Sequence, residues 1–297
     1  MYNQIDSNKR NSMFLIVIFF AVLLGVGYAY DYIYGGQGQV PYLGMIIAVG
    51  FSLLMTSVSY FKGDKIALSA SGAKEIQKTD NPYVYRMVEN LCITAGLPAP
   101  KVYLIDDPSI NAFATGRKPE LASIAVTKGA IEKLENEELE GVIAHELSHV
   151  GNYDIRFMML VTVLVGAIAI LADWFMRISI WGGRGRSRSN KGGHPALIII
   201  GLVFIVLSPI IAQLIKFAIS RKREYLADAS ASLLTRYPEG LASALEKIAY
   251  ENKPLARASK ATAHLYIANP FSGTKVKKLF STHPPIEERI KKLRKMA

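Results

Sequence analysis

Residues 145–149 read His-Glu-Leu-Ser-His, and the rest of the chain can be placed relative to this stretch. On a helix, His145 and His149 lie four residues apart on one face, so both imidazole rings can reach one metal ion. Glu146 then projects beside that ion, where its carboxylate can take a proton from a bound water molecule. Residues 136–140, Asn-Glu-Glu-Leu-Glu, are typical of a helix start and lead into the motif. The alternative is a helix that carries two histidines by coincidence.

The composition limits the class of protein and the kind of metal site. Of the 297 residues, 51% are hydrophobic, and the apolar residues gather in blocks, which is unusual for a soluble domain. Cys92 is the only cysteine, so an intramolecular disulfide and a cysteine-based zinc site are excluded. The net charge of +11 fits either nucleic-acid binding or a membrane protein with its Lys and Arg on the cytoplasmic side. The apolar blocks favour the membrane protein.

The first 60 residues predict a transmembrane hairpin. Residues 13–30 and 40–60 are apolar and long enough to cross a bilayer, and residues 31–39 between them contain no Lys or Arg. Basic residues flank the pair on both outer sides (Lys9 and Arg10 before it, Lys62 and Lys65 after it), which places both ends in the cytoplasm. No small-residue cleavage site follows the first run, so it is expected to remain as a signal anchor.

Residues 61–156 have the composition of a soluble domain and form the first half of the predicted catalytic domain. The pattern predicts a helix at 81–95 and strands at 101–105, 111–116 and 123–127, with a hairpin loop at 116–120. Together the strands predict a small antiparallel sheet directly before the motif helix. An edge strand of such a sheet can pair with an extended peptide across the metal.

Residues 157–219 predict a second membrane hairpin, with apolar stretches at 157–180 and 196–219. The loop at 181–195 is rich in Gly, Arg and Ser, and its four basic residues conflict with a position outside the cell. Either both stretches cross fully, or the hairpin enters the membrane without crossing it. In both cases residues 145–156 lie on the same side as residues 220–297. This last segment is predicted to be the second half of the catalytic domain, with helices at 220–234, 238–249 and 285–296.

A catalytic zinc site needs a third protein ligand besides His145 and His149. The predicted helix at 220–234 offers Glu224 and Asp228, which lie on one face. Glu224 could bind the metal, while Asp228 accepts a hydrogen bond from the outer nitrogen of a ligating histidine. The alternative is an acidic pair on a solvated helix face, neutralised by neighbouring arginines.

These motifs together resemble the M48 family of integral-membrane zinc metalloproteases, and within it the bacterial heat-shock proteases. The resemblance covers nearly the whole chain except residues 182–193. It implies a mainly α membrane protein with a zincin-like (gluzincin) catalytic domain, a small antiparallel sheet and about four transmembrane or membrane-associated helices. The residues that carry it are His145–His149, Glu224–Asp228, Asn111–Ala114 and Ser281–Arg289.

The resemblance implies a role for each of these residues and one Zn²⁺ per chain. His145, His149 and Glu224 would be the zinc ligands, Glu146 the general base and Asp228 a hydrogen-bond partner of a ligand. His283 would help to bind substrate or stabilise the oxyanion, although a histidine before two prolines fits an exposed loop equally well. The substrate-pairing strand would consist of Asn111, Ala112, Phe113 and Ala114.

The function implied is a multi-pass zinc endopeptidase of the inner, or cytoplasmic, membrane, with its active site facing the cytoplasm. Its expected partners are membrane or unfolded polypeptide substrates, the lipid bilayer and other membrane quality-control proteases, with no nucleic acid. One alternative is a CAAX-type protease for prenylated proteins, although such enzymes have more membrane spans. Another is a non-catalytic membrane scaffold or transporter with a coincidental motif, which would bind no stoichiometric zinc.

Overall fold

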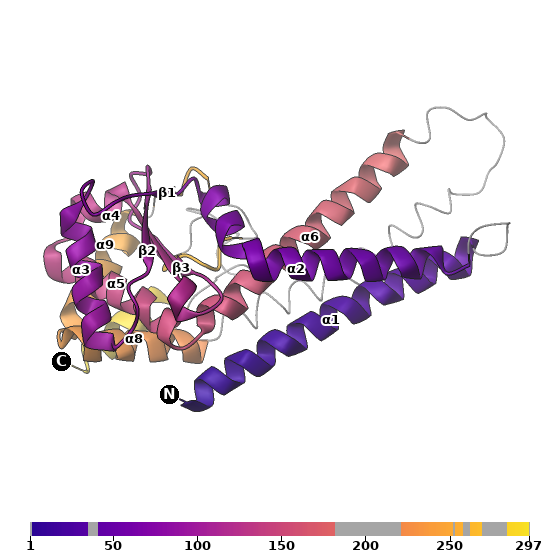
Figure 1. The fold of residues 1–297 in the computed structure, drawn as a ribbon. Helices are drawn as coiled ribbons and strands as arrows, with labels where there is room; N and C mark the ends of the chain where they lie inside the picture. The colour runs from indigo at the N-terminus through magenta and orange to yellow at the C-terminus, as the bar shows by residue number, and fades with distance from the viewer. Residues whose placement is uncertain are drawn as a thin grey trace.

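The computed structural model describes residues 2–34, 41–181, 221–251, 253–257, 262–268 and 284–296. Two long apolar helices, α1 (Tyr2–Tyr34) and α2 (Leu43–Ser71), lie side by side and extend away from the rest of the chain (Figure 1). Both are long and apolar enough to cross a membrane, as predicted. The carboxylate of Asp31 accepts hydrogen bonds from the backbone of Gly44 (2.7 Å) and Met45 (3.0 Å), which satisfies the first amides of α2.

A third long helix, α6 (Asp154–Trp181), follows α5 (Asn136–Gly151) after a bend of 83°. If the bent pair counts as one broken span, the described residues contain up to three candidate spans, compared with the four that were predicted. The fourth predicted stretch (196–219) and the loop at 181–195, apart from its first residue, lie outside the described residues. The number of crossings in the second hairpin therefore stays a prediction.

The sheet is mixed, so the prediction of an antiparallel sheet is wrong in part. Its order is β1 (Lys74–Glu75), β2 (Lys101–Ile105), β4 (Ser123–Thr127) and β3 (Ala112–Thr115). The pairs β1–β2 and β3–β4 are antiparallel, but β2 and β4 are parallel, with Lys101 opposite Ser123. The reason is that β4 returns between β2 and β3 after the hairpin, whose loop contains the short helix η1 (Pro119–Leu121). β3 is left at the edge of the sheet, as expected.

Helix α5 lies at the centre of the predicted catalytic domain, against β3 and between the other helices (Figure 1). Its neighbours α8 (Arg221–Thr235), α9 (Pro238–Glu251), α3 (Pro82–Ala95) and α10 (Ile286–Leu293) match the predicted helices within a few residues, and α4 (Lys128–Lys133) precedes α5. α5 and α9 approach closely at Gly141, where a Cβ atom would lie 2.7 Å from the backbone nitrogen of Leu241. Only glycine allows this approach, and the core around α5 is fully buried.

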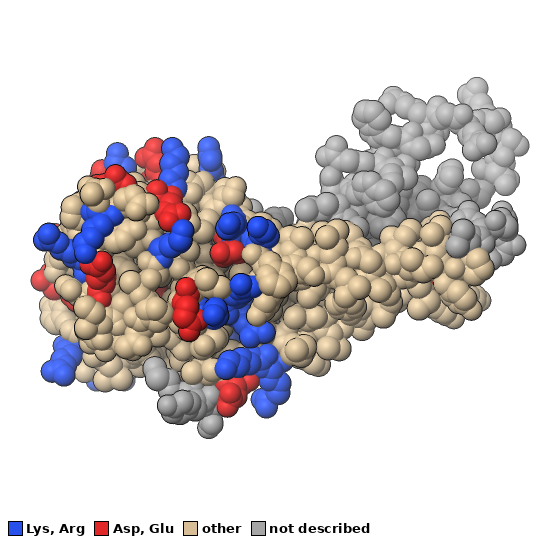
Figure 2. Space-filling view, viewed as in Figure 1, with Lys and Arg blue, Asp and Glu red and all other residues tan. Residues whose placement is uncertain are grey.

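The hydrophobic residues form two separate clusters. The larger one fills the space between the sheet and the helices of the catalytic domain. The smaller one joins α1, α2 and α6 through Leu15, Phe19, Leu160 and Leu164, among others. Charged side chains cover the catalytic domain, whereas the visible face of the extended arm carries almost none (Figure 2). This distribution fits an arm that lies in lipid and a domain that lies in water.

Candidate metal centre

Helix α5 brings the two predicted histidine ligands together. Its start is fixed by Glu138, whose carboxylate accepts a hydrogen bond from the backbone of Glu135 at 2.7 Å. One turn separates His145 from His149, and their Nε2 atoms lie 3.3 Å apart in the interior of the protein. Two nitrogens bound to one tetrahedral zinc at about 2.0–2.1 Å would lie about 3.3 Å apart. The spacing of the two rings therefore fits a shared metal ion.

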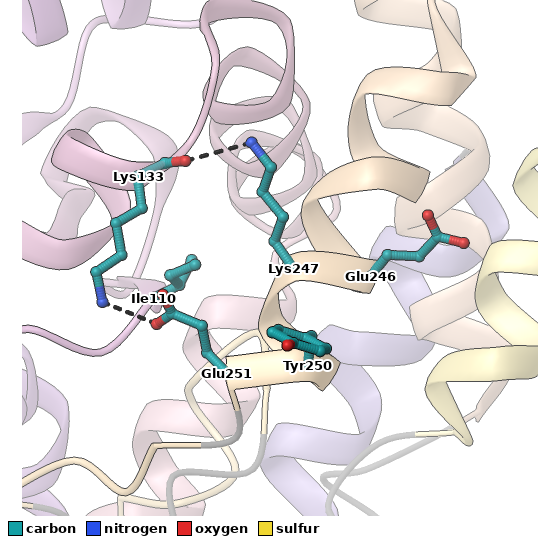
Figure 3. A pocket seen from close by; sticks show the side chains of 6 residues that line it. All are labelled: Ile110, Lys133, Glu246, Lys247, Tyr250 and Glu251. Atoms are coloured by element: carbon teal, nitrogen blue, oxygen red, sulfur yellow. Dashed lines mark hydrogen bonds and ion pairs between the residues drawn. The ribbon is translucent and has the colours of Figure 1, made fainter.

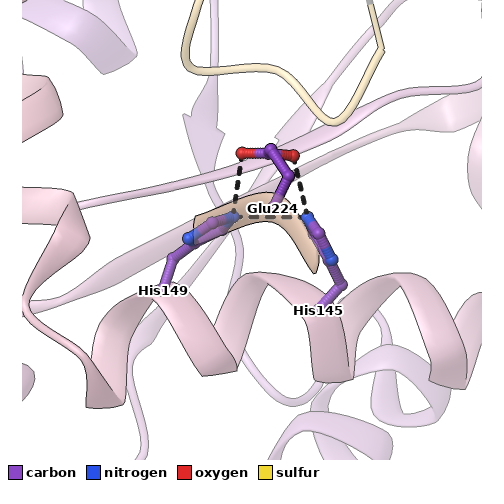
Figure 4. Close-up of side chains that lie close together, drawn as sticks. All are labelled: His145, His149 and Glu224. Carbon is purple, nitrogen blue, oxygen red and sulfur yellow. Dashed lines mark hydrogen bonds and ion pairs between the residues drawn. The ribbon is translucent and has the colours of Figure 1, made fainter. Parts of the chain in front are cut away.

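Glu224 of α8 supplies a third donor on the same side of α5 (Figure 4). Its carboxylate oxygens lie 3.8 Å from Nε2 of His145 and 3.7 Å from Nε2 of His149. The donor atoms of all three residues lie within 4.8 Å of one another, and all three side chains are buried. Two imidazoles and one carboxylate are a donor set that suits a catalytic zinc ion. The predicted ligands thus meet at one point, although α5 and α8 are far apart in the sequence.

Each of the two histidines has a carboxylate at its Nδ1 atom. Oδ1 of Asp228 lies 3.0 Å from Nδ1 of His145, which is the contact expected from the sequence. Oδ2 of Asp154 lies 3.0 Å from Nδ1 of His149. Burial lowers the pKa of His149, but the hydrogen bond that its ring donates to Asp154 and the nearby carboxylates raise this pKa to about 9. The paired carboxylates fix both rings with Nε2 turned toward Glu224.

Arg289 of α10 holds Asp228 in place and is fully buried. Its Nε and Nη2 donate to the two oxygens of Asp228 at 2.9 and 2.6 Å, and its Nη1 donates to the carbonyl of Ile267 at 3.3 Å. Burial alone would raise the pKa of Asp228, but the charge of Arg289 and the hydrogen bonds from His145 and Arg289 lower it to about 2. Asp228 is therefore a permanent anion, able to orient His145 at any physiological pH.

Glu146 lies beside the ligand pair on α5 and is buried. Its Oε2 accepts a hydrogen bond from the backbone nitrogen of Ala114 at 2.8 Å, and its Oε1 has no partner among the described residues. Burial raises the pKa of Glu146, and the neighbouring His145 and His149 offset part of this shift. A carboxylate with a raised pKa and one free oxygen is suited to accept a proton.

Strand β3 places the predicted substrate-pairing residues next to Glu146. The backbone of Asn111 forms hydrogen bonds with Thr127 of β4. Because backbone groups alternate in direction along a strand, those that point away from β4, toward the open edge, belong to Ala112 and Ala114. The carbonyl of Ala112 accepts a hydrogen bond from the backbone of Ile267 at 3.0 Å, so the chain's own segment already pairs with part of this edge. The side chain of Phe113 is buried in the core, where its ring packs against the ring of Tyr266.

The remaining predicted residue, His283, lies outside the described residues, so its role stays a prediction. Two residues with clear contacts at the site had no predicted role. Asp154 follows the motif helix within five residues of His149, and this short spacing was the signal available for it. Arg289 belongs to the quoted C-terminal motif, but nothing in its local sequence indicates that its side chain is buried against Asp228.

A surface hollow of about 310 Å³ lies between α4 and α9, away from the metal ligands (Figure 3). An ion pair of 2.8 Å between Lys133 and Glu251 crosses it, and Lys247 donates to the carbonyl of Lys133 at 3.3 Å. None of the residues that line the hollow belongs to the metal cluster. We assign it no part in the chemistry.

Comparison with known proteins agrees with the family resemblance of the sequence motifs. The family model described as "Peptidase family M48" matches residues 78–297. "Protease HtpX homolog" of Dictyoglomus turgidum is 48% identical over 99% of this chain and 94% of its own length, and that of Tropheryma whipplei strain Twist is 45% identical over 100% and 98%.

A solved structure, that of S. mikatae Ste24p, has a similar fold. It is 19% identical, with a TM-score of 0.51 over 99% of this chain and 67% of the other. At this identity the likeness concerns the fold alone. The family match covers His145, His149, Glu224 and β3, and the relatives match along almost their full length. The chain therefore belongs to peptidase family M48.

Proposed function

We propose that this membrane metalloprotease is a zinc-dependent endopeptidase that cuts membrane or misfolded proteins at the cytoplasmic face of the inner membrane. The observation that carries the proposal is the buried cluster of His145, His149 and Glu224, whose donor atoms lie within 4.8 Å of one another. Glu146 adjoins the cluster with an unpaired oxygen. These are the groups that hydrolysis of a peptide bond at zinc requires.

The proposed chemistry assigns each side chain one task. A zinc ion held by His145, His149 and Glu224 would supply an activated water molecule and polarise the scissile carbonyl. Glu146 accepts the proton of the attacking water and then delivers it to the nitrogen of the leaving amine. Asp228 and Asp154 keep the two imidazole rings in the orientation that exposes Nε2.

The substrate is proposed to bind as an extended strand along β3. The backbone nitrogen of Ala114 donates to Glu146, so a peptide along this strand would pass close to the reacting groups. Pairing along the whole edge requires Ile267 to leave the carbonyl of Ala112 and Glu146 to leave the backbone nitrogen of Ala114. The orientation toward the cytoplasm rests on the basic residues at the outer ends of the first hairpin.

The role in membrane-protein quality control, and association with other proteases of that kind, rest on the resemblance to heat-shock members of the family. Cleavage of prenylated proteins remains the alternative substrate class, and none of the residues that the structure describes favours it. A non-catalytic scaffold is disfavoured by the arrangement of three donors with a proton acceptor.

The test is cleavage of an unfolded membrane protein by the detergent-purified full chain, with zinc content measured on the same samples. Glu146→Gln should retain zinc and lose cleavage, whereas Glu224→Ala should lose both. Glu140→Gln makes the same change of charge on the same helix outside the cluster and should leave both unchanged. A chelator should stop the wild-type reaction, and added zinc should restore it. Cleavage by Glu146→Gln at the wild-type rate would contradict the proposal.

A further inference from the structure

Asn8 lies near the start of α1, before the apolar part of this helix, and is buried: only 1% of it is exposed. Its Nδ2 donates to the carbonyl of Asn152 at 2.9 Å and to Oδ1 of Asp154 at 2.6 Å. Its own Oδ1 is buried and has no partner among the described residues. The amide therefore acts here as a donor, and both of its targets lie directly after the motif helix.

Asp154 is the residue that connects Asn8 to the metal centre. Its Oδ2 is bonded to Nδ1 of His149 at 3.0 Å, while its Oδ1 receives the amide of Asn8. Arg223 lies 3.5 Å from the same Oδ1, and its guanidinium stacks over the ring of Phe157 at 4.7 Å. Arg223 thus supplies charge compensation, whereas Asn8 supplies a short, directional hydrogen bond.

The bond from Asn8 fixes the plane of the Asp154 carboxylate. A carboxylate can rotate about its bond to Cβ, and this rotation would move Oδ2 away from His149. With Oδ1 held by Asn8 and the neighbouring carbonyl of Asn152 held by the same amide, the carboxylate has one favourable orientation. Interactions of this kind behind a metal ligand commonly change metal affinity by about 10–100-fold.

We propose that Asn8 is a positioning residue of the metal centre, so that membrane helix α1 sets the orientation of His149 through Asp154. The inference rests on the metal role proposed above for His149. It assigns a function to the cytoplasmic end of α1 beyond anchoring the chain in the membrane. A displacement of α1 relative to α6 would loosen a metal ligand without touching the metal itself.

A purely structural role for Asn8 would be the attachment of α1 to α6, and Ser12 provides a matched control. Ser12 lies one turn further along α1 and is fully buried, and among the described residues its hydroxyl donates to the carbonyl of Asn8, at 2.8 Å. Ser12→Ala therefore perturbs the same buried helix face without touching Asp154. Asn8→Ala removes the donor, and Asn8→Asp places a second carboxylate of the same size against Asp154.

The experiment uses the full chain in detergent with Glu146→Gln as background, so that no peptide bond is cut during the titration. Zinc affinity is measured by competition with a chelator, the visible spectrum is recorded with cobalt in place of zinc, and the unfolding temperature is recorded for each variant. Asn8→Ala should bind zinc about tenfold more weakly, and Asn8→Asp more weakly still. Both should change the cobalt spectrum, whereas Ser12→Ala should match the background protein in both measurements.

The two proposals fail in different ways. If the background protein binds no stoichiometric zinc, the proposed function is wrong. If it binds zinc, but both Asn8 variants bind it as tightly as Ser12→Ala does and give the same cobalt spectrum, then Asn8 does not position the ligand. A lower unfolding temperature with unchanged metal affinity would also overturn the inference, because it would leave Asn8 with a structural role alone.

Discussion

Replacement of Arg289 by Met tests how the metal centre is supported from behind. The guanidinium is fully buried and makes two hydrogen bonds, of 2.9 and 2.6 Å, to the carboxylate of Asp228. Met removes the charge but nearly preserves the apolar volume of the side chain. Loss of one partner from a buried ion pair costs about 3–5 kcal/mol, because the other charge remains without compensation. For a domain of this size, that corresponds to a fall of about 6–20 °C in the unfolding temperature.

The same variant should weaken metal binding. The charge of Arg289 is a main reason for the low pKa of Asp228, about 2, so its removal raises that pKa. Without the two hydrogen bonds from Arg289, the carboxylate of Asp228 is also free to rotate away from Nδ1 of His145, at present 3.0 Å away. We expect zinc affinity to fall by about 10–100-fold. Thermal unfolding and chelator competition, both in the Glu146→Gln background, measure the two effects separately.

Two further variants make the result interpretable. In the double variant Asp228→Leu, Arg289→Met, both charges of this ion pair are removed together, so much of the stability should return. Zinc affinity should stay low, because no carboxylate then orients His145. Arg294→Met, which removes an exposed arginine from the end of α10, should change neither quantity appreciably. An Arg289→Met protein with wild-type unfolding temperature and zinc affinity would refute the assigned role of Arg289.

Three other predictions concern the catalytic domain. Gly141→Ala should destabilise the protein by about 1–3 kcal/mol, because its Cβ would lie 2.7 Å from the backbone of Leu241; Gly151→Ala on the same helix, with its nearest contact at 3.6 Å, is the control in thermal unfolding. Burial raises the pKa of Cys92 to about 11, so a thiol reagent at pH 8 should label the unfolded protein and not the folded one, and labelling of the native state would contradict the buried position. Burial alone would raise the pKa of Asp107, but hydrogen bonds from Ser109 and the backbone of Ala256 lower it below its usual value of 3.8. The ionised carboxylate of Asp107 therefore stabilises the fold at a pH above 3.8, and this stabilisation is lost as the pH falls below that value. The difference in unfolding temperature between wild type and Asp107→Asn should be large at pH 7 and small near pH 3. A difference that does not depend on pH would contradict a stabilising role of this carboxylate.

The parts of the molecule that could be predicted from the sequence depend on local spacing. His145 and His149 share a helix face because they are four residues apart, and the same rule pairs Glu224 with Asp228. From the sequence, these two helices could be assigned to the same side of the membrane only by counting the apolar stretches between them. The structure places all four residues together, although the number of crossings between them stays a prediction.

Features that depend on contacts between distant segments could not be found in this way. The parallel pairing of β2 and β4 could not be predicted, because the residue pattern of two five-residue strands is the same in a parallel and in an antiparallel pair. Burial of Arg289 depends on α10 packing against α8, and an Arg in a charged terminal helix normally indicates a solvated face. Asn8 looks like part of a polar segment before a membrane helix, and only its contact with Asp154 distinguishes it.

The positions of the two supporting carboxylates connect the metal centre to the membrane part of the chain. Asp154 is the first residue of α6, which bends by 83° away from the helix that carries His149. Asp228 lies on α8, which begins directly after the second predicted hairpin. The carboxylates that orient the two histidines therefore lie at the beginning or after the end of predicted membrane segments, and Asn8 lies near the start of another. A metal site built in this way requires correct packing of the membrane helices, so misplacement of any of them should weaken metal binding before it unfolds the catalytic domain.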